Sequence, residues 1–117
     1  MIYGRICSTN GECLVEDVSK TTNFFERFIG LLGTASLAEN KGLLISPCSS
    51  VHCIGMRYPI DLIFLNKEWQ VVKTVKTLKP WRFSASSEAS MVLEIAANKL
   101  DKINISKNDK LEWHENN

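Results

Sequence analysis

Residues 60–65 have the sequence Ile-Asp-Leu-Ile-Phe-Leu, and this stretch decides the fold. A strand with one face in water alternates between apolar and polar residues, but here both sets of positions are apolar. Such a short, uninterrupted run is typical of a central strand that is covered on both faces. Asp61 interrupts it, and a carboxylate buried in such a strand must be paired or hydrogen-bonded. We therefore expect a β-rich fold with residues 60–65 near its centre.

Short β-like runs occur along most of the chain around this strand. Pro47, Pro59 and Pro80 and several polar loops separate them. The predicted strands are residues 13–18, 42–46, 50–55, 60–65, 69–76, 90–95 and 109–113. Their number and spacing favour a small sandwich or barrel.

One helix is predicted, over residues of about 23–32. Asn23 and Glu26 form a capping-box pattern at its start, and Gly33 provides a stop signal. Its apolar residues repeat with helical spacing, namely Phe24, Phe25, Phe28, Leu31 and Leu32. We expect a mainly β domain, α+β at the margin. It would be a compact antiparallel β-sandwich or barrel of six to seven short strands, with this N-terminal helix packed on it.

Length and charge limit the classes of function. The 117 residues predict a single domain over 1–117 with a short flexible tail at 114–117, and about two-thirds of the extended surface buried. A net charge of +1 gives no reason to expect a nucleic-acid partner. The N-terminus lacks the apolar centre of a signal peptide, and no run is long enough to cross a membrane. We expect a cytoplasmic protein, monomeric or weakly dimeric.

The four cysteines raise the question of a disulfide or a metal site. Zinc knuckles usually have two to four residues between their cysteines; Cys7 and Cys13 are separated by five, outside this range, and Cys48 and Cys53 by four, at its upper limit. A reducing compartment argues against a structural disulfide. We predict no metal and no other cofactor. Cys48, His52 and Cys53 lie within six residues, however, and a zinc site there, completed by Cys7 and Cys13, is the open alternative.

Five segments occur in an order that resembles a known family: residues 27–33, 42–45, 56–65, 71–72 and 92–95. Together they resemble the domain-of-unknown-function 192 family, also called uncharacterised protein family 0127, over a core of about 13–113. The chain is similar to its non-secreted branch. The resemblance implies a compact, mostly β domain without an established activity.

Three positions depart from the pattern of that family. Asn98 and Asn108 occur in turns where the pattern of the family contains glycine, and Glu68 stands where the family usually has glycine. Asn tolerates a positive φ better than most other residues do. We therefore expect the turns at Asn98 and Asn108 to be kept, whereas Glu68 leaves its turn type open.

The buried acids suggest structural ion pairs. Asp61 and Glu94 each interrupt a strand that is otherwise apolar, and an arginine offers a planar fork that suits a carboxylate. Arg27, Arg57 and Arg82 are the candidate partners. We expect pairs among Arg27, Asp61 and Glu94 that join the helix and loops to the sheet.

Two classes of function remain. We expect a non-catalytic ligand-binding or accessory module, with Arg57, Trp81 and Arg82 lining the site for an unidentified small molecule or protein. The alternative is a small enzyme in which His52 or Cys48 works with Asp61 in acid–base or nucleophilic chemistry. Loss of folding in Asp61→Asn would favour the first, and loss of activity in a folded variant the second.

Overall fold

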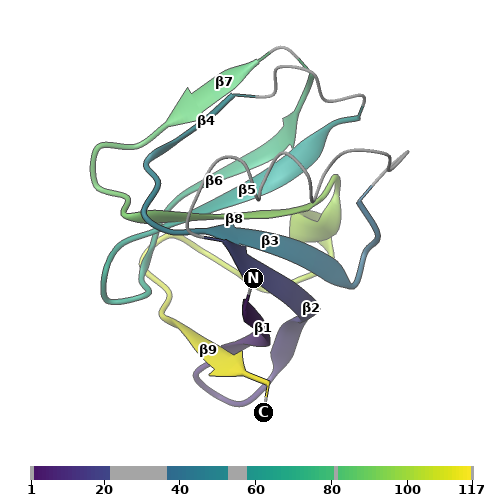
Figure 1. The fold of residues 1–117 in the computed structure, drawn as a ribbon, viewed down its shortest axis with the longest axis vertical. Coiled ribbons are helices and arrows are strands. Elements are labelled where there is room, and N and C mark those ends of the chain that lie inside the picture. The colour runs from purple at the N-terminus through teal and green to yellow at the C-terminus, as the bar shows by residue number, and fades with distance from the viewer. Residues whose placement is uncertain (1, 22–36, 53–57, 81, 117) are drawn as a thin grey trace.

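The computed structural model describes residues 2–21, 37–52, 58–80 and 82–116, with only the backbone of His52. Within these ranges the chain forms nine strands and one short 3-10 helix (Figure 1). They are β1 (Ile2–Ser8), β2 (Cys13–Thr21), β3 (Lys41–Ile45), β4 (Ser50–His52), β5 (Ile60–Leu65), β6 (Val71–Leu78), β7 (Phe83–Ala85), β8 (Met91–Ala96), η1 (Lys99–Asp101) and β9 (Leu111–Glu115).

Seven of these strands form one curled sheet, in the order β6-β5-β8-β3-β2-β1-β9. Neighbouring strands are antiparallel except for β2 and β3, which are parallel. The two outermost strands approach each other where they begin. The Val71 amide donates to the Asp109 carbonyl at 2.8 Å, and the Leu111 amide donates to the Trp69 carbonyl at 2.9 Å. These bonds bend the sheet into a half-barrel.

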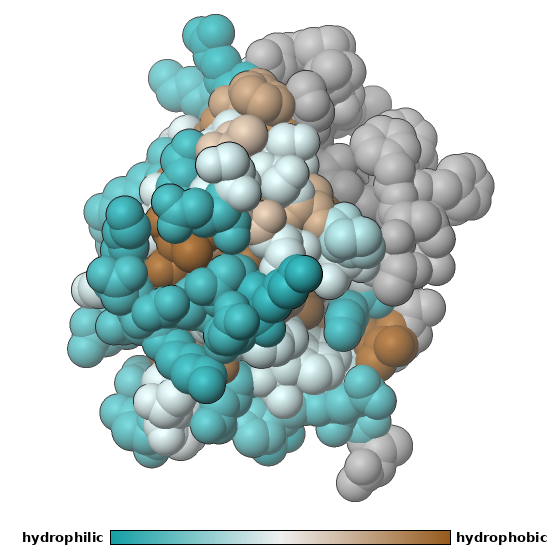
Figure 2. Space-filling model, turned by 90° about the vertical axis from the view of Figure 1, so that its left-hand side faces the viewer, coloured by the Kyte–Doolittle hydropathy of each residue, from teal (hydrophilic) through white to brown (hydrophobic). Residues whose placement is uncertain are grey.

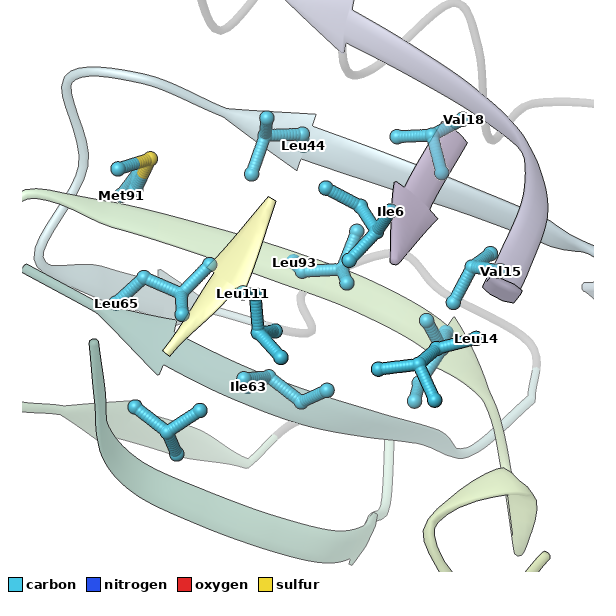
Figure 3. Packing of buried hydrophobic residues seen from close by; sticks show 12 residues of the cluster. Ile6, Leu14, Val15, Val18, Leu44, Ile63, Leu65, Met91, Leu93 and Leu111 are labelled. Atoms are coloured by element: carbon cyan, nitrogen blue, oxygen red, sulfur yellow. The ribbon is translucent and has the colours of Figure 1, made fainter. Parts of the chain in front are cut away.

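The inner face of the half-barrel holds the larger hydrophobic core. Figure 3 shows side chains of this core, from β1, β2, β5, β8 and other strands, pointing toward one another across this space. The fully buried members include Ile6, Val15, Val18, Leu44, Ile63, Leu65, Val71, Leu93 and Ile95. Burial of this much apolar area is the main favourable contribution to folding.

A second, smaller core lies on the outer face of the same sheet. It joins β5 and β8 to the separate two-stranded sheet β4–β7, which forms a further layer in Figure 1. Its buried members are Val51, Tyr58, Ile60, Leu62, Phe64, Leu78 and Val92. All six residues of β5 are therefore buried, between β6 and β8. This confirms that residues 60–65 form a central strand covered on both faces.

The predicted architecture is wrong in other respects. The sheet is mixed, because β2 and β3 run parallel, and the described residues form nine strands where six to seven were expected. None of the described residues lies in an α-helix, so the expected helix-decorated sheet is not what they form. The helix predicted at about 23–32 lies outside the described residues.

Two of the observed strands, β1 and β7, were not predicted, and the reason in each case is physical. β1 contains Gly4 and Arg5, which break the apolar alternation expected of a strand. Gly4 is needed there because the Trp113 ring lies over it: a Cβ would sit 2.7 Å from that ring. β7 has three residues, too few for a period to be recognised.

Two turns keep the conformation that glycine would supply. Asn98 has a φ of 70° and Asn108 a φ of 79°, both left-handed. The prediction that Asn can replace glycine in these turns is confirmed. No helix among the described residues is long and apolar enough to cross a membrane.

Candidate functional site

Asp61 is fully buried, and both of its carboxylate oxygens accept hydrogen bonds from backbone amides. The Thr77 amide donates to Oδ1 at 2.7 Å, and the Leu100 amide donates to Oδ2 at 3.0 Å. One carboxylate thus links β5 to β6 and to η1. Hydrogen bonds to an ionised acceptor are among the stronger ones in proteins, so the residue has an evident structural task.

The Thr77 amide is available because β6 has a β-bulge at this point. Ile60 pairs with Leu78 but Leu62 pairs with Val75, so Lys76 and Thr77 lie together opposite Asp61. A bulge removes a residue from regular ladder bonding, and Thr77 also has a positive φ of 55°. The carboxylate supplies the acceptor that the irregular ladder lacks.

Asp61 also serves the beginning of η1. The side chain of Asn98, which precedes this helix, makes no capping hydrogen bond, and the amide of Leu100 donates to the Asp61 carboxylate instead. At the solvent side, the Lys76 ammonium pairs with the carboxylate of Asp101. The bulge and the short helix are thereby held together by one buried and one exposed acid.

Glu94 is the second fully buried carboxylate, and it lies on the opposite face of the sheet. Its neighbours Leu93 and Ile95 point into the inner core, whereas Glu94 shares the outer face with Val92. Thr21, also fully buried, is on this outer face at the partner position of Ile45. The outer face thus combines apolar packing with two buried polar side chains.

The structure does not bring Cys48 and Asp61 together. Cys48 packs against the outer core, and its thiol donates to the Ser50 carbonyl at 3.0 Å. Its amide donates to Ser90, whose amide in turn donates to Leu65 at the far end of β5. Four residues of strand, about 13 Å, separate Leu65 from Asp61. Asp61 shares the inner face of β5 with Ile63 and Leu65, on the side away from Cys48.

Three of the predicted site residues lie outside the part of the chain that the structure describes, namely Arg27, Arg57 and Trp81, and so does the side chain of His52. The proposed arginine pairs with Asp61 and Glu94 therefore stay predictions. The backbone of His52 is described, and it pairs with Phe83 across β4 and β7.

The β4–β7 sheet presents an aromatic and a cationic side chain to solvent. Phe83 is 57% exposed, and Arg82 beside it is also exposed. Val51 of β4 belongs to the outer core, and its partner on β7, Ser84, is also buried. We call Arg82, Phe83 and the paired backbone of residues 50–52 the β7 surface.

A lysine of β6 fixes this surface to the main sheet. The Lys73 ammonium donates to the Ala85 carbonyl of β7 at 2.9 Å and lies 5.6 Å from the centre of the Phe64 ring. The contact to β7 could not be found from spacing, because it joins residues of two different sheets.

A second view shows the distribution of hydrophobic residues on one face of the described chain. Figure 2 shows a largely hydrophilic face with small hydrophobic areas separated by hydrophilic ones. Among the residues that the structure describes, no three His, Cys, Asp or Glu side chains gather closely enough to hold a metal ion.

Comparisons with known proteins agree on one family and one fold. Residues 5–113 match DUF192, described as "Uncharacterized ACR". The chain is 32% identical over 114 residues to a UPF0127 protein of Pyrococcus furiosus, covering 91% of this chain and 94% of that protein.

Two crystal structures share the fold. One is a proposed transcription regulator from Sinorhizobium meliloti 1021, with a TM-score of 0.77 and 20% identity over 96% of this chain and 92% of that one. The other is a protein of unknown function from Novosphingobium aromaticivorans DSM 12444, with a TM-score of 0.73 and 20% identity over 95% and 84%.

Proposed function

The chain belongs to the DUF192 family, and we propose that it is a non-catalytic ligand-binding or accessory module that binds on its β7 surface. The observation that carries this proposal is the exposure of Phe83, 57%, on a strand whose next residue, Ser84, is buried. An exposed aromatic on a firmly packed strand is ready to bind without reorganising.

The residues at this surface favour a flat ligand that carries a carboxylate. Arg82 offers a guanidinium fork that matches a carboxylate in geometry and charge, and Phe83 is an exposed aromatic side chain next to it in the chain. Trp81 and Arg57 are the further residues that we assign to the site, from their types and their positions in the sequence.

A binding role, rather than catalysis, is supported by what the buried acid does. Both oxygens of Asp61 accept backbone hydrogen bonds, and a general base needs an oxygen within reach of its substrate. Cys48 lies against the other face of the sheet. Neither residue is placed to work with the other.

One structural relative is described as a proposed transcription regulator, but we do not extend that role to this chain. The net charge of this chain, +1, provides little of the phosphate neutralisation on which DNA binding depends. We propose a small molecule, or a carboxylate group of a protein, as the ligand.

The test is NMR titration of the ¹⁵N-labelled protein with benzoate, indole-3-acetate and methyl glucoside. We expect the two carboxylates to shift the amides of residues 50–52 and 82–85 and the uncharged glucoside to shift them less. Arg82→Gln should weaken carboxylate binding about tenfold or more, because one charge-assisted bond is lost.

Lys79→Gln is the matched control, since Lys79 is an exposed cation three residues away. It should change the affinity by less than about twofold, as expected for a rim charge. Equal losses of carboxylate affinity in both variants would show that only non-specific electrostatic attraction is at work. Chemical-shift changes centred on Thr77 and Leu100 would place the binding site at Asp61 instead. Either result would overturn the proposal.

A further inference from the structure

The β1–β2 hairpin brings two cysteines into direct opposition. Its loop is closed by the Ser8 amide, which donates to the Glu12 carbonyl at 2.8 Å, and by the Gly11 amide, which donates to Ser8 at 3.1 Å. Gly11 has the positive φ, 92°, that this three-residue loop requires. The next pair along the ladder is Cys7 with Cys13.

The position of this pair in the ladder suits a bond between the two sulfurs. Hydrogen-bonded and non-hydrogen-bonded pairs alternate in antiparallel strands, so Cys7 and Cys13 follow Ser8 and Glu12 as a non-hydrogen-bonded pair. In such pairs the Cα atoms are about 4.5 Å apart and the side chains lie on the same face. This is within the range of about 4.4–6.8 Å that disulfides span.

The two thiols differ in their access to solvent. Cys7 is 3% exposed, whereas Cys13 is an exposed residue at the start of β2. A reagent in solution can therefore reach the sulfur of Cys13 more easily than that of Cys7. Both are free thiols in this structure.

We propose that Cys7 and Cys13 form a reversible dithiol–disulfide site that low-molecular-weight disulfides oxidise. The Cys13 thiolate attacks one sulfur of the reagent, forms a mixed disulfide and releases one thiolate. The Cys7 thiolate then attacks the Cys13 sulfur and displaces the second. The two cysteines lose two electrons and two protons, and the reagent is reduced to two thiols.

The surroundings of Cys13 make this a slow reaction at neutral pH. Burial, the facing Cys7 thiol and the Glu16 carboxylate raise the pKa of Cys13, and Arg5 opposes them. On its other side, Cys7 pairs with Glu112 of β9, a further negative charge in this region. A thiol with a raised pKa has less thiolate at pH 7, so the dithiol persists until the oxidant is abundant or the pH rises.

The experiment uses oxidised glutathione on the intact protein, followed by alkylation of the remaining thiols, trypsin digestion and mass spectrometry. Cleavage after Arg5 and Lys20 gives a peptide of residues 6–20 that contains only these two cysteines. We expect this peptide to escape alkylation and to be lighter than its dithiol form by two hydrogen atoms. Dithiothreitol should restore both thiols.

A second peptide, residues 42–57, contains Cys48 and Cys53 and serves as the internal comparison. Cys13→Ser removes the exposed member of the pair and should leave Cys7 as a thiol, whereas Cys48→Ser should leave oxidation of peptide 6–20 unchanged. The proposal fails if peptide 6–20 stays a dithiol or carries two glutathiones while peptide 42–57 is oxidised. It also fails if Cys48→Ser alone prevents oxidation of peptide 6–20.

Discussion

The two strands that close the half-barrel, β6 and β9, are held in different ways. β6 is held by polar bonds: the buried Asp61 carboxylate accepts the Thr77 amide, and Lys76 pairs with Asp101. β9 pairs regularly with β1, and the Trp113 ring packs over Gly4 of that strand. Both strands are outermost in the sheet, and both join at residues 69–71 and 108–111.

This difference teaches how an irregular edge can be kept in place. β6 has a bulge that leaves a ladder amide without its usual partner, and a buried acid provides one. β9 pairs regularly with β1 over five residues and needs only a close approach. We therefore expect the position of β6 to depend on the charge of Asp61, and that of β9 to depend on the absence of a side chain at Gly4.

The largest effect is expected from Asp61→Ala. The amides of Thr77 and Leu100 would lose an ionised acceptor in a buried setting, so unfolding free energy should fall by about 3–5 kcal/mol. Asp61→Asn should fall between this variant and the native chain, because its amide carbonyl can still accept one bond. Urea unfolding followed by circular dichroism measures the change.

Asp101→Ala is the matched control, since Asp101 is a carboxylate of the same region but its side chain is 53% exposed. Its unfolding free energy should fall by less than about 1 kcal/mol. A loss in Asp61→Ala no larger than that of the control would contradict the role that we assign to the buried carboxylate.

A smaller effect is expected from Gly4→Ala. The added Cβ would lie 2.5 Å from the His114 carbonyl oxygen and 2.7 Å from the Trp113 ring, so β9 must move. Overpacking of this kind costs about 1–3 kcal/mol. Hydrogen exchange should show faster exchange of the β9 amides, with those of β5 and β8 little changed.

Gly11→Ala separates this local effect from general destabilisation. Gly11 has a positive φ but no atom within 4 Å of an added Cβ, so the substitution strains the hairpin loop without touching β9. Its cost is about 1–2 kcal/mol. If both variants expose the β9 amides equally, β9 is not held by the close approach at Gly4.

The smallest effect is expected from Lys76→Gln. The hydrogen bond and charge of Asp101 raise the pKa of Lys76 above its ordinary 10.5. A raised lysine pKa stabilises the folded state fully below the unfolded pKa, and that contribution disappears as the pH rises through the folded pKa. Because the Lys76 side chain is largely exposed, the stability difference from the native chain should be slight below pH 10.5 and should vanish above the folded pKa.

This difference is measured by urea unfolding of both proteins at several values between about pH 9 and 12. A difference that persists unchanged to the highest pH would show that packing of the lysine stem, and not its charge, is responsible. The contrast between the two closing strands would then rest on Asp61 alone.

The central strand was predictable because its composition alone reports its environment. Residues 60–65 are apolar on both faces, and only burial on both sides accommodates such a strand in water. The turns at Asn98 and Asn108 were predictable for a similar reason, since few residues adopt a positive φ. By contrast, β1 was not predicted, because the glycine that it contains, Gly4, makes room for the ring of Trp113, more than a hundred residues away in the sequence.

The candidate site was less predictable than the fold. Sequence reasoning found that Asp61 must be satisfied, but it looked for an arginine, whereas the described partners are two backbone amides. Backbone partners carry no signal in the sequence, since every residue except proline has an N–H. The opposition of Cys7 and Cys13 escaped in the same way, because it depends on the register of a strand that was not predicted.

The pairing of β1 with β9 also governs how the chain reaches its folded state. These strands come from opposite ends of the described chain, and contacts between such distant segments slow folding because a long loop must close first. Until β9 arrives, β1 has an unpaired edge that can join another chain. We therefore expect the edge of β1 to stop promoting aggregation once β9 has been synthesised and has paired with it.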